Sequence, residues 1–393
     1  MPRQRSRRLW RVAVLIESSR AYGRDLISGI ARYSREQGDW VLHFEPRGLE
    51  LPPAWLRDWE GDGILARFPS SEAAMRLPPL RIPVVDLYGT LTPSGFPLVG
   101  TDNTRVAHLA FEHFWEQGIR HFAFCGLTPG YWPYIEQRGE AFRRCVEEAG
   151  HPCSLFSVPS AHWAVADWER EETQIADWLR TLPKPIGIFA CYDERAYQVL
   201  NACRRIGLRV PDEAAVLGVG NDPVLCDMAT PPLSSIDLDA QRIGYTAAAC
   251  LDRMMRGRRQ QKPIYLPPCG LTARRSTDLL AVADPEVAGV LRFIRDHACE
   301  GIRIRDVLAQ TAVSSSTLER KFRRFLGRTP KAEMLRVQIA RACQLLTESQ
   351  LSLKEVAYRC GFHSEKYFSD AFYRLCHKRP TAYRQEQHQI RGL

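Results

Sequence analysis

The chain has 393 residues, of which 25% are charged, and a formal net charge of +9. It contains no run of 18 apolar residues and no signal-peptide pattern after its basic N-terminal tail (residues 1–11), so the sequence predicts neither a membrane span nor export. Its 12 cysteines form no Cys-x-x-Cys pair, which favours free thiols in the cytoplasm over disulfides or a zinc site.

Residues 12–275 alternate between strand-like and helix-like segments. Short apolar runs predict strands at 12–16, 41–44, 63–66, 83–87, 99–102, 121–125, 186–190, 215–219, 233–236 and 264–266. Amphipathic spacing predicts helices at 26–33, 104–117, 137–149, 168–182, 194–206 and 243–255. This alternation predicts an α/β fold with doubly wound parallel sheets, and the length suits two lobes joined by a hinge.

A doubly wound sheet binds its ligands beyond the carboxyl ends of its strands. Seven polar or aromatic residues stand at such places: Tyr22, Arg24, Asp102, Trp132, Arg138, Asp193 and Asn221. Their polar groups could bind the hydroxyls of a sugar, and the ring of Trp132 could stack on its apolar face. For Asp102, Asp193 and Asn221, capping of the following helix is an equally good explanation, whereas Arg138 has no capping role.

Residues 276–285 are polar and form the predicted linker to an all-α domain at 286–393. In that domain, a helix-turn-helix pattern over Val307–Pro330 recurs over Val356–Pro380, with an offset of 49 residues before the turn and 50 after it. A helical segment at 331–346 could join the two copies rigidly. The second helix of such a motif can lie in the major groove of DNA.

The residues predicted to face DNA follow each turn. They are Ser315, Ser316, Thr317, Glu319, Arg320, Lys321 and Arg323 in the first copy, and His363, Ser364, Glu365, Lys366 and Tyr367 in the second. Arg320 is the predicted base reader, because arginine on guanine is the commonest specific contact. Lys321, Arg323 and Lys366 are predicted to contact phosphates. Residues 285–393 hold 20 basic and 11 acidic residues, hence the entire net charge, as expected of a DNA-binding domain.

The motifs of enzymes are missing from the sequence. It has no G-x-G-x-x-G turn after a strand, no G-K-[ST] phosphate loop, no H-E-x-x-H pair and no G-x-S-x-G elbow. No cofactor and no metal site is predicted. A sugar-modifying enzyme is therefore disfavoured, and so is a solute-binding protein, because it would need export and would leave the basic helical domain unexplained.

The two parts each resemble a known family. The helical domain resembles the AraC/XylS-type DNA-binding domain, through the doubled motif, the Gly361-Phe362 turn and the ending Pro380-x-x-Tyr383-Arg384. Residues 12–275 resemble the sugar-binding core of LacI-type regulators and periplasmic binding proteins. The segments that carry this second resemblance are Asp102-Asn103, Gly118–Phe124, Arg138-x-x-x-Phe142, Ala190–Ala196 and Val216–Asn221.

A LacI-like sensor followed by an AraC-like reader resembles the xylose operon regulatory protein family along nearly the whole chain. The segments Ala21–Arg24, Thr101–Asn103 and Arg274–Asp278 carry this resemblance. It implies a homodimeric activator that binds D-xylose or a related pentose, double-stranded DNA and RNA polymerase. One departure is Gly220, where the family pattern has Asp. Asp222 is the candidate substitute, and a different sugar or another small molecule is the alternative effector.

Overall fold

The structure is a computed structural model that describes residues 9–37, 40–46, 54–67, 82–89, 96–129, 132–158, 168–258, 262–278, 284–349 and 351–391. Contacts divide the chain into two units, Met1–Leu279 and Leu280–Leu393. Most of the predicted N-terminal tail (residues 1–8) and residues 279–283 of the predicted linker lie outside the described residues. Within the described ranges, no helix is both long enough and apolar enough to cross a membrane.

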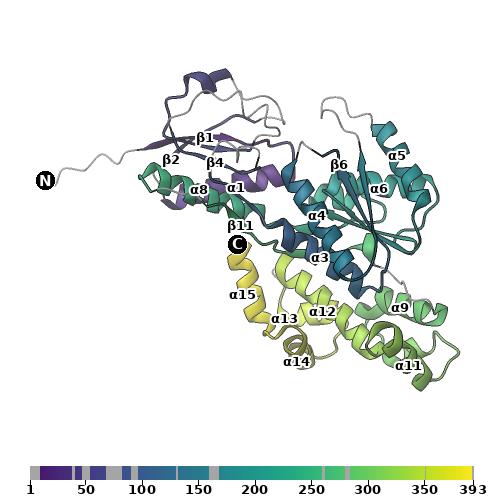
Figure 1. Cartoon of the computed structure of the whole chain (residues 1–393). Helices are drawn as coiled ribbons and strands as arrows, with labels where there is room; N and C mark the ends of the chain where they lie inside the picture. The colour runs from purple at the N-terminus through teal and green to yellow at the C-terminus, as the bar shows by residue number, and fades with distance from the viewer. Residues whose placement is uncertain are drawn as a thin grey trace. The chain divides into compact units, whose positions relative to one another are not determined.

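The first unit contains two α/β lobes (Figure 1). The sheet of the first lobe is parallel, with the strand order β2-β1-β3-β4. Its strands are β1 (Trp10–Leu15), β2 (Trp40–Phe44), β3 (Gly63–Ala66) and β4 (Val84–Asp86), followed by β5 (Val99–Thr101), which pairs with β11 (Ile264–Leu266). Helices α1 (Ala21–Gln37) and α8 (Ala240–Met255) pack against this lobe, and a short 3-10 helix covers Ala54–Asp58.

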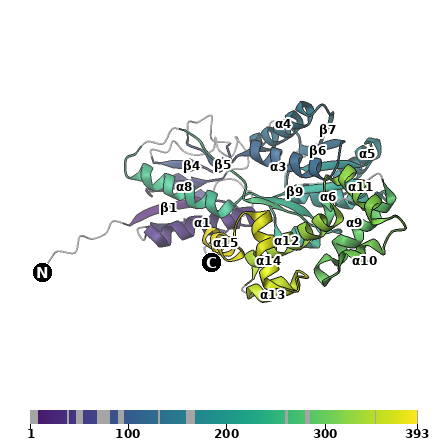
Figure 2. The same ribbon diagram turned by 90° about the horizontal axis from the view of Figure 1, so that it is seen from below.

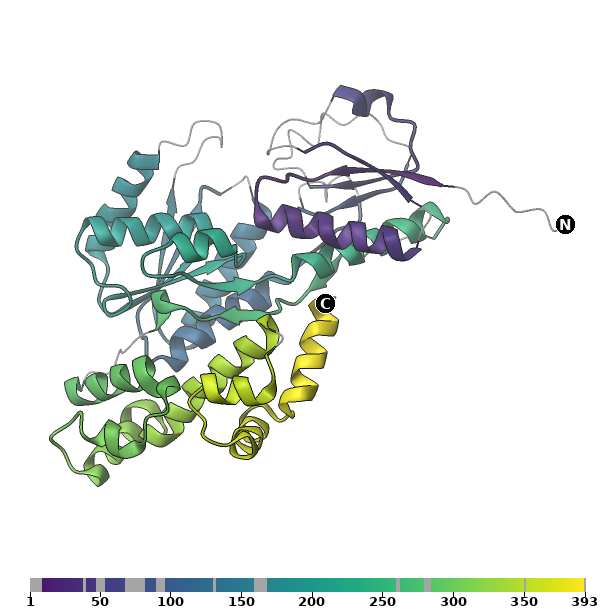
Figure 3. The same ribbon diagram turned by 180° about the vertical axis from the view of Figure 1, so that it is seen from behind.

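Helices α1 and α8 lie side by side (Figure 3), although they are far apart in the sequence. Glycine makes this close crossing possible. A Cβ atom on Gly29 would lie 1.9 Å from the carbonyl oxygen of Gln241, and one on Gly244 would lie 2.1 Å from that of Leu26. Both distances are far below van der Waals contact, so a side chain at either position would force the helices apart.

The second lobe has a six-stranded sheet with the order β12-β10-β9-β8-β6-β7, parallel except for β12. Its strands are β6 (Phe122–Leu127), β7 (Cys153–Val158), β8 (Ile186–Ala190), β9 (Ala214–Val219), β10 (Ser234–Asp237) and β12 (Gly270–Thr272). Its helices are α3 (Asn103–Glu116), α4 (Pro133–Glu148), α5 (Trp168–Thr181), α6 (Asp193–Arg205) and α7 (Pro223–Met228), with a 3-10 turn at Arg275–Thr277. Ile188 and Phe189 of β8 point to opposite faces, onto α5 and α6 and onto α4 respectively.

The predicted fold class is confirmed, and the strands and helices predicted in this unit all correspond to elements of the structure. The prediction missed β7, β12 and α7. Strands β7 and β12 are the two edges of their sheet. Leu155 of β7 is 52% exposed, so this strand lacks the continuous apolar run that marks a strand covered on both faces.

The chain passes between the lobes three times. It crosses between β5 and α3, returns between β10 and α8, and crosses again between β11 and β12. Three short connections of this kind form a hinge, because small rotations in each of them open or close the two lobes together.

The second unit consists of helices, arranged as two helix-turn-helix motifs on either end of a long helix, α12 (Figure 2). The elements are α9 (Pro285–His297), a 3-10 turn (Ala298–Glu300), α10 (Ile304–Leu308), α11 (Ser315–Leu326), α12 (Pro330–Glu348), α13 (Leu353–Arg359), α14 (Glu365–Cys376) and α15 (Pro380–Arg391). Each motif has its own apolar core, the first around Leu318 and Phe322 and the second around Phe368 and Phe372. Helix α12 contributes side chains to both cores, which makes it the rigid connection that the sequence predicted.

The helix caps reproduce the sequence repeat. Arg303 and Ser352, 49 residues apart, begin the first helix of each motif, and the backbone N–H of each donates to the carboxylate three positions later, Asp306 or Glu355. Ser314 and Ser364, 50 residues apart, cap the second helix through their side-chain oxygens. The extra residue in the second turn is therefore confirmed by the caps themselves.

Candidate functional site

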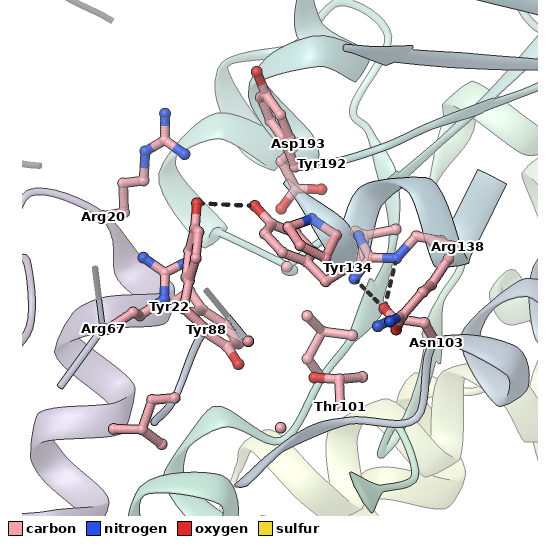
Figure 4. A pocket seen from close by; sticks show the side chains of 18 of the residues that line it. Arg20, Tyr22, Arg67, Tyr88, Thr101, Asn103, Tyr134, Arg138, Tyr192 and Asp193 are labelled. Carbon is pink, nitrogen blue, oxygen red and sulfur yellow. Dashed lines mark hydrogen bonds between the residues drawn. The ribbon is translucent and has the colours of Figure 1, made fainter. Parts of the chain in front are cut away.

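A cavity of about 450 Å³ lies at the carboxyl ends of the strands, and both lobes of the first unit line it. This is where a doubly wound fold places its ligand. The labelled residues of Figure 4 line it: Arg20, Tyr22, Arg67, Tyr88, Thr101, Asn103, Tyr134, Arg138, Tyr192 and Asp193. They combine three guanidinium groups with four tyrosine rings, a composition suited to a polar ligand that also has an apolar face.

Arg138 lies on the first turns of α4 and is only 2% exposed. Its Nε and Nη2 donate to Oδ1 of Asn103, at 3.2 and 3.0 Å, and its Nη1 donates to the carbonyl oxygen of Cys191. All three bonds go to neutral acceptors. Burial lowers the pKa of Arg138, because the hydrogen bonds that the structure describes for it go to neutral groups and not to a carboxylate. Two of its five N–H groups stay available for a ligand in the cavity.

Asp193 begins α6, directly after the end of β8, and its carboxylate is 2% exposed. One oxygen accepts a hydrogen bond from Oγ of Ser235, at 2.5 Å, and the other accepts one from the backbone N–H of Asp222, at 2.8 Å. Burial raises the pKa of Asp193 to about 7 in spite of these two bonds. The group therefore changes its protonation near neutral pH.

Arg67 follows β3 and forms a buried ion pair with Glu17. Its guanidinium lies over two aromatic rings, 4.3 Å from the ring centre of Tyr88 and 5.1 Å from that of Tyr22. Such cation–π contacts hold a guanidinium plane and an aromatic wall in fixed positions. Burial raises the pKa of Tyr22, Tyr88 and Tyr134, so these hydroxyls remain neutral hydrogen-bonding groups.

Contacts between the lobes at the cavity include an ion pair and a pair of tyrosines. Nε of Arg20, before α1, lies 3.0 Å from a carboxylate oxygen of Glu194 on α6. The hydroxyl oxygens of Tyr88 and Tyr134 are 3.4 Å apart, and their rings meet edge to face. A change in the angle between the lobes must break or remake these contacts, so they are sensitive to what the cavity holds.

Of the predicted ligand-binding residues, the structure brings four together around the cavity: Tyr22, Arg138, Asp193 and Asp222. The other four do not line it. Asp102 caps α3 by accepting from the backbone N–H of Arg105, and its neighbour Asn103 faces the cavity in its place. Capping, the alternative explanation for Asp102, is therefore what the structure contains.

Arg24, Asn221 and Trp132 are each held elsewhere. Arg24 is exposed and donates to the carbonyl oxygens of the two serines before α1. Asn221 has a positive φ of 52°, and its Oδ1 accepts from Nη1 of Arg274 at 3.0 Å. Trp132 is buried directly before α4, and the ring that reaches the cavity belongs to Tyr134, two positions later.

Gly220 lines the cavity and adopts a φ of +127°, which side-chain-bearing residues rarely adopt. A Cβ atom there would also lie 3.1 Å from Oδ2 of Asp193. A carboxylate at this position is thus disfavoured by backbone conformation and by proximity to another carboxylate. Asp222, the predicted substitute, lines the cavity while its Oδ1 accepts from the N–H groups of Val224 and Leu225.

The sequence reasoning missed Arg67, Tyr88, Asn103, Tyr134 and Tyr192. A signal existed for several of them. Arg67 and Tyr88 directly follow predicted strands, so the same strand-end rule that selected Asp193 would have selected them. Tyr134 lies one turn before Arg138, on the same face of α4.

The predicted DNA-facing residues lie along α11, at the start of α14 or just before α14. Most are exposed: Ser315, Ser316, Glu319, Arg320, Arg323, His363, Ser364, Glu365, Lys366 and Tyr367, whereas Thr317 is half-buried. Ser364 and Thr317 have structural tasks, since Ser364 caps α14 and the hydroxyl of Thr317 accepts from Oγ of Ser314. The side chains beside them leave a polar surface on each second helix, which is basic on α11, whereas on α14 the acidic and basic residues balance.

Lys321 differs from the other predicted phosphate contacts. Its Nζ lies 2.8 Å from a carboxylate oxygen of Asp284 and 2.5 Å from one of Glu286. These two hydrogen bonds raise the pKa of Lys321. Two local carboxylates therefore already neutralise this ammonium group, which the sequence pattern did not indicate.

Comparison with known families places a match on each part of the chain. Residues 11–104 match the XylR N-terminal domain, residues 111–277 match the periplasmic binding protein-like domain, and residues 307–386 match a helix-turn-helix domain. The sequence is 31% identical to the xylose operon regulatory protein of Escherichia coli K12 over 95% of this chain and 96% of that protein. It is 30% identical to the protein of the same name from Haemophilus influenzae Rd, over 95% of this chain and 98% of that protein.

A solved structure supports the same relationship. The structure of a xylose-binding transcription activator, xylR, superimposes with a TM-score of 0.64 at 30% sequence identity. The match covers 96% of this chain and 98% of that one. Both parts of the chain, and their order, are therefore similar to those of transcription regulators.

Proposed function

The chain belongs to the family of xylose operon regulatory proteins, and on this premise we propose that its first unit binds D-xylose or a related pentose and thereby controls DNA binding by its second unit. The observation that carries the proposal is the presence, in one chain, of a polar and aromatic cavity between hinged lobes and a duplicated helix-turn-helix. The protein acts in the cytoplasm as a homodimeric activator, and it contacts RNA polymerase at the promoter.

The cavity contains the groups that a pentose requires. The two remaining N–H groups of Arg138 donate to ring hydroxyls, and the carboxylate of Asp222 accepts from them. The tyrosine rings cover the apolar face of the sugar. Gly220 supplies no side-chain acceptor, so specificity among pentoses depends on Asp193 and Asp222, whose carboxylates also line the cavity.

Coupling to DNA follows from closure of the lobes. A sugar that contacts both lobes stabilises the closed arrangement, in which Arg20 meets Glu194 and Tyr88 meets Tyr134. The sugar can shift the protein only by the difference between its affinities for the closed and the open arrangements. The closed arrangement in turn favours the orientation of the helix-turn-helix motifs that fits the operator.

The experiment that tests this proposal combines two titrations of the purified full-length protein. Tryptophan fluorescence is followed during addition of D-xylose, L-arabinose, D-ribose or D-glucose, and DNA sequences are selected from a random pool with and without the active sugar. We expect a saturable fluorescence change with a pentose and a selected DNA motif that is bound more tightly in its presence. If a DNA motif is selected but none of the four sugars changes the fluorescence, the proposal that the effector is a pentose is rejected. If no motif is selected, the proposal that the protein is a sequence-specific regulator is rejected.

A further inference from the structure

Two cysteines face each other between the long helix α12 and α14. Helices α11 and α14, the second helices of the two motifs, are called the first and second recognition helices. Cys343 lies on α12, and Cys376 is the last residue of α14. Their Sγ atoms are 3.8 Å apart, although 33 residues separate them in the sequence. Both thiols are half-buried, so a small solute reaches them while the helices keep them close together.

The surroundings of the pair hold it in place. The two side chains pack at the edge of the core formed by Ile339, Phe368 and Phe372, next to the ring of Tyr383. The helices hold the two sulfur atoms 3.8 Å apart, so a small movement of α14 toward α12 lets them meet. Regulation by sugar and binding to DNA make no use of this pair.

We propose that Cys343 and Cys376 are a redox-modification site, at which a hydroperoxide such as hydrogen peroxide converts the two thiols into an intramolecular disulfide. The thiolate of one cysteine attacks an oxygen of the peroxide and becomes a sulfenic acid, and hydroxide leaves and takes up a proton. The second sulfur then attacks the sulfenic sulfur, the S–S bond forms, and water leaves. In sum, two thiols and one hydrogen peroxide give one disulfide and two water molecules.

Cys376 is the residue that attacks first. The two thiols lie within hydrogen-bonding distance, and this interaction lowers the pKa of Cys376. The same hydrogen bond, together with burial, raises the pKa of Cys343. Thiolate is the reactive form of cysteine, so the pair has a built-in order of attack and resolution.

The disulfide changes the position of a recognition helix. An S–S bond is about 2.05 Å long, so the sulfur atoms must approach by about 1.8 Å. This movement draws the carboxyl end of α14 toward α12 and tilts the opposite end, which carries Glu365, Lys366 and Tyr367. We therefore expect oxidation to weaken specific DNA binding by about tenfold, the contribution of roughly one base contact.

The test treats the full-length protein with hydrogen peroxide and compares it with Cys376→Ser, Cys343→Ser and, as the matched control, Cys299→Ser. Cys299 is half-buried in the same unit. Peptide mapping identifies the bonded cysteines, and fluorescence anisotropy on a selected DNA site gives the affinity. We expect one Cys343–Cys376 disulfide in the wild type and in Cys299→Ser, with loss of DNA affinity that a dithiol reductant reverses.

Neither Cys376→Ser nor Cys343→Ser should respond, while both should bind DNA like the reduced wild type, which shows that they are folded. A disulfide between other cysteines, or a wild type that stays reduced in peroxide while a free-thiol reagent labels both residues, would overturn the site. A disulfide that leaves the DNA affinity unchanged would overturn its regulatory effect.

Discussion

At the scale of single residues, Arg138 has the largest predicted effect on the affinity for the sugar effector. Replacing it with Gln removes the charged donor from the cavity, and hydrogen bonds to charged groups contribute about 1.5–3 kcal/mol each. We expect the affinity for the sugar to fall by roughly tenfold to a hundredfold in a fluorescence titration. Arg138→Lys keeps the charge but loses the planar guanidinium, so its affinity for the sugar should lie between those of the wild type and Arg138→Gln.

Arg24→Gln is the control for this experiment. Arg24 comes from a neighbouring part of the same unit but does not line the cavity, and its hydrogen bonds among the described residues go to backbone carbonyls before α1. The prediction for Arg138 fails if the two variants lose sugar affinity to the same extent.

Asp193 makes stability depend on pH in a direction opposite to that of most carboxylates. Its pKa is about 7 in the native protein because of burial, whereas an unfolded chain releases this proton near pH 4. The native state therefore binds more protons over this range, and the free energy of unfolding falls as the pH rises from about 4 to about 7, by up to roughly 1.4 kcal/mol per pH unit.

Urea denaturation between pH 5 and 8 measures this contribution. In Asp193→Asn, Oδ1 can still accept from the N–H of Asp222, and the carboxyl proton no longer exists. The difference in unfolding free energy between wild type and variant should change with pH below 7 and level off above it. A difference that is constant over the whole range would show that Asp193 keeps an ordinary pKa.

The sequence predicted the position of the cavity better than its composition. Strand-end placement selected Tyr22, Arg138 and Asp193, which line one cavity in the structure. It could not decide between Asp102 and Asn103, because adjacent residues at a helix start point in different directions and only one of them caps the helix. Arg274, which fixes Asn221, is 53 residues away from it, and such long-range partners leave no local trace in the sequence.

At the scale of elements, α11 carries the predicted base reader. Arg320 is exposed on this helix, and Arg320→Ala should weaken binding to the selected DNA site by roughly 1–3 kcal/mol and relax the preference at one base position. Affinity for random DNA should change little. Equal losses on selected and random DNA would identify Arg320 as a phosphate contact.

Helix α12 depends on a buried carboxylate. Glu333 is fully buried, with Arg336 at 2.8 Å and Arg328 at 2.5 Å. Burial would raise its pKa, but the hydrogen bond from Arg336 and the surrounding guanidinium charges lower it to about 2. The stabilisation is thus complete above about pH 4.5 and is lost as the pH falls toward 2.

Glu333→Gln removes the buried carboxylate that Arg328 and Arg336 contact. We expect the helical unit to lose about 3 kcal/mol of unfolding free energy at pH 7, as is usual when one member of a buried ion pair is removed. Thermal unfolding followed by circular dichroism measures the loss. Glu319→Gln, on the exposed side of α11, should unfold like the wild type, and an equal effect of both changes would contradict a special role of Glu333.

The repeat was the part of the fold most visible in the sequence. Glycine and serine at the turns, and phenylalanines at Phe322 and Phe372, are set by local rules of capping and amphipathicity. Strand β7 was missed because it is exposed at Leu155, so its apolar pattern is broken. Local rules therefore predicted helices with good turns better than strands at sheet edges.

At the scale of the whole molecule, the two ligands of the protein must influence each other equally. If the sugar tightens DNA binding by a given factor, bound DNA tightens sugar binding by the same factor. The sugar is titrated with and without a saturating amount of the selected DNA, and the DNA is titrated with and without the sugar. Each pair of titrations gives the ratio of the two affinities. We expect the two ratios to agree, and a persistent disagreement would mean that a further process, such as dimer assembly, changes during one titration.

The ion pairs of Lys321 give this regulator a mechanical property. Lys321 lies on the first recognition helix, and one of its partners, Asp284, is the residue that caps α9 at the beginning of the second unit. A displacement of the chain at Asp284 is thus transmitted to α11 through the ion pairs of Lys321, without passing through the apolar core. Added salt weakens these ion pairs, because it screens the attraction between charges that solvent reaches. Ionic strength should therefore alter how strongly the position of α11 depends on that of the chain at Asp284. This effect adds to the usual weakening of the attraction to DNA phosphates.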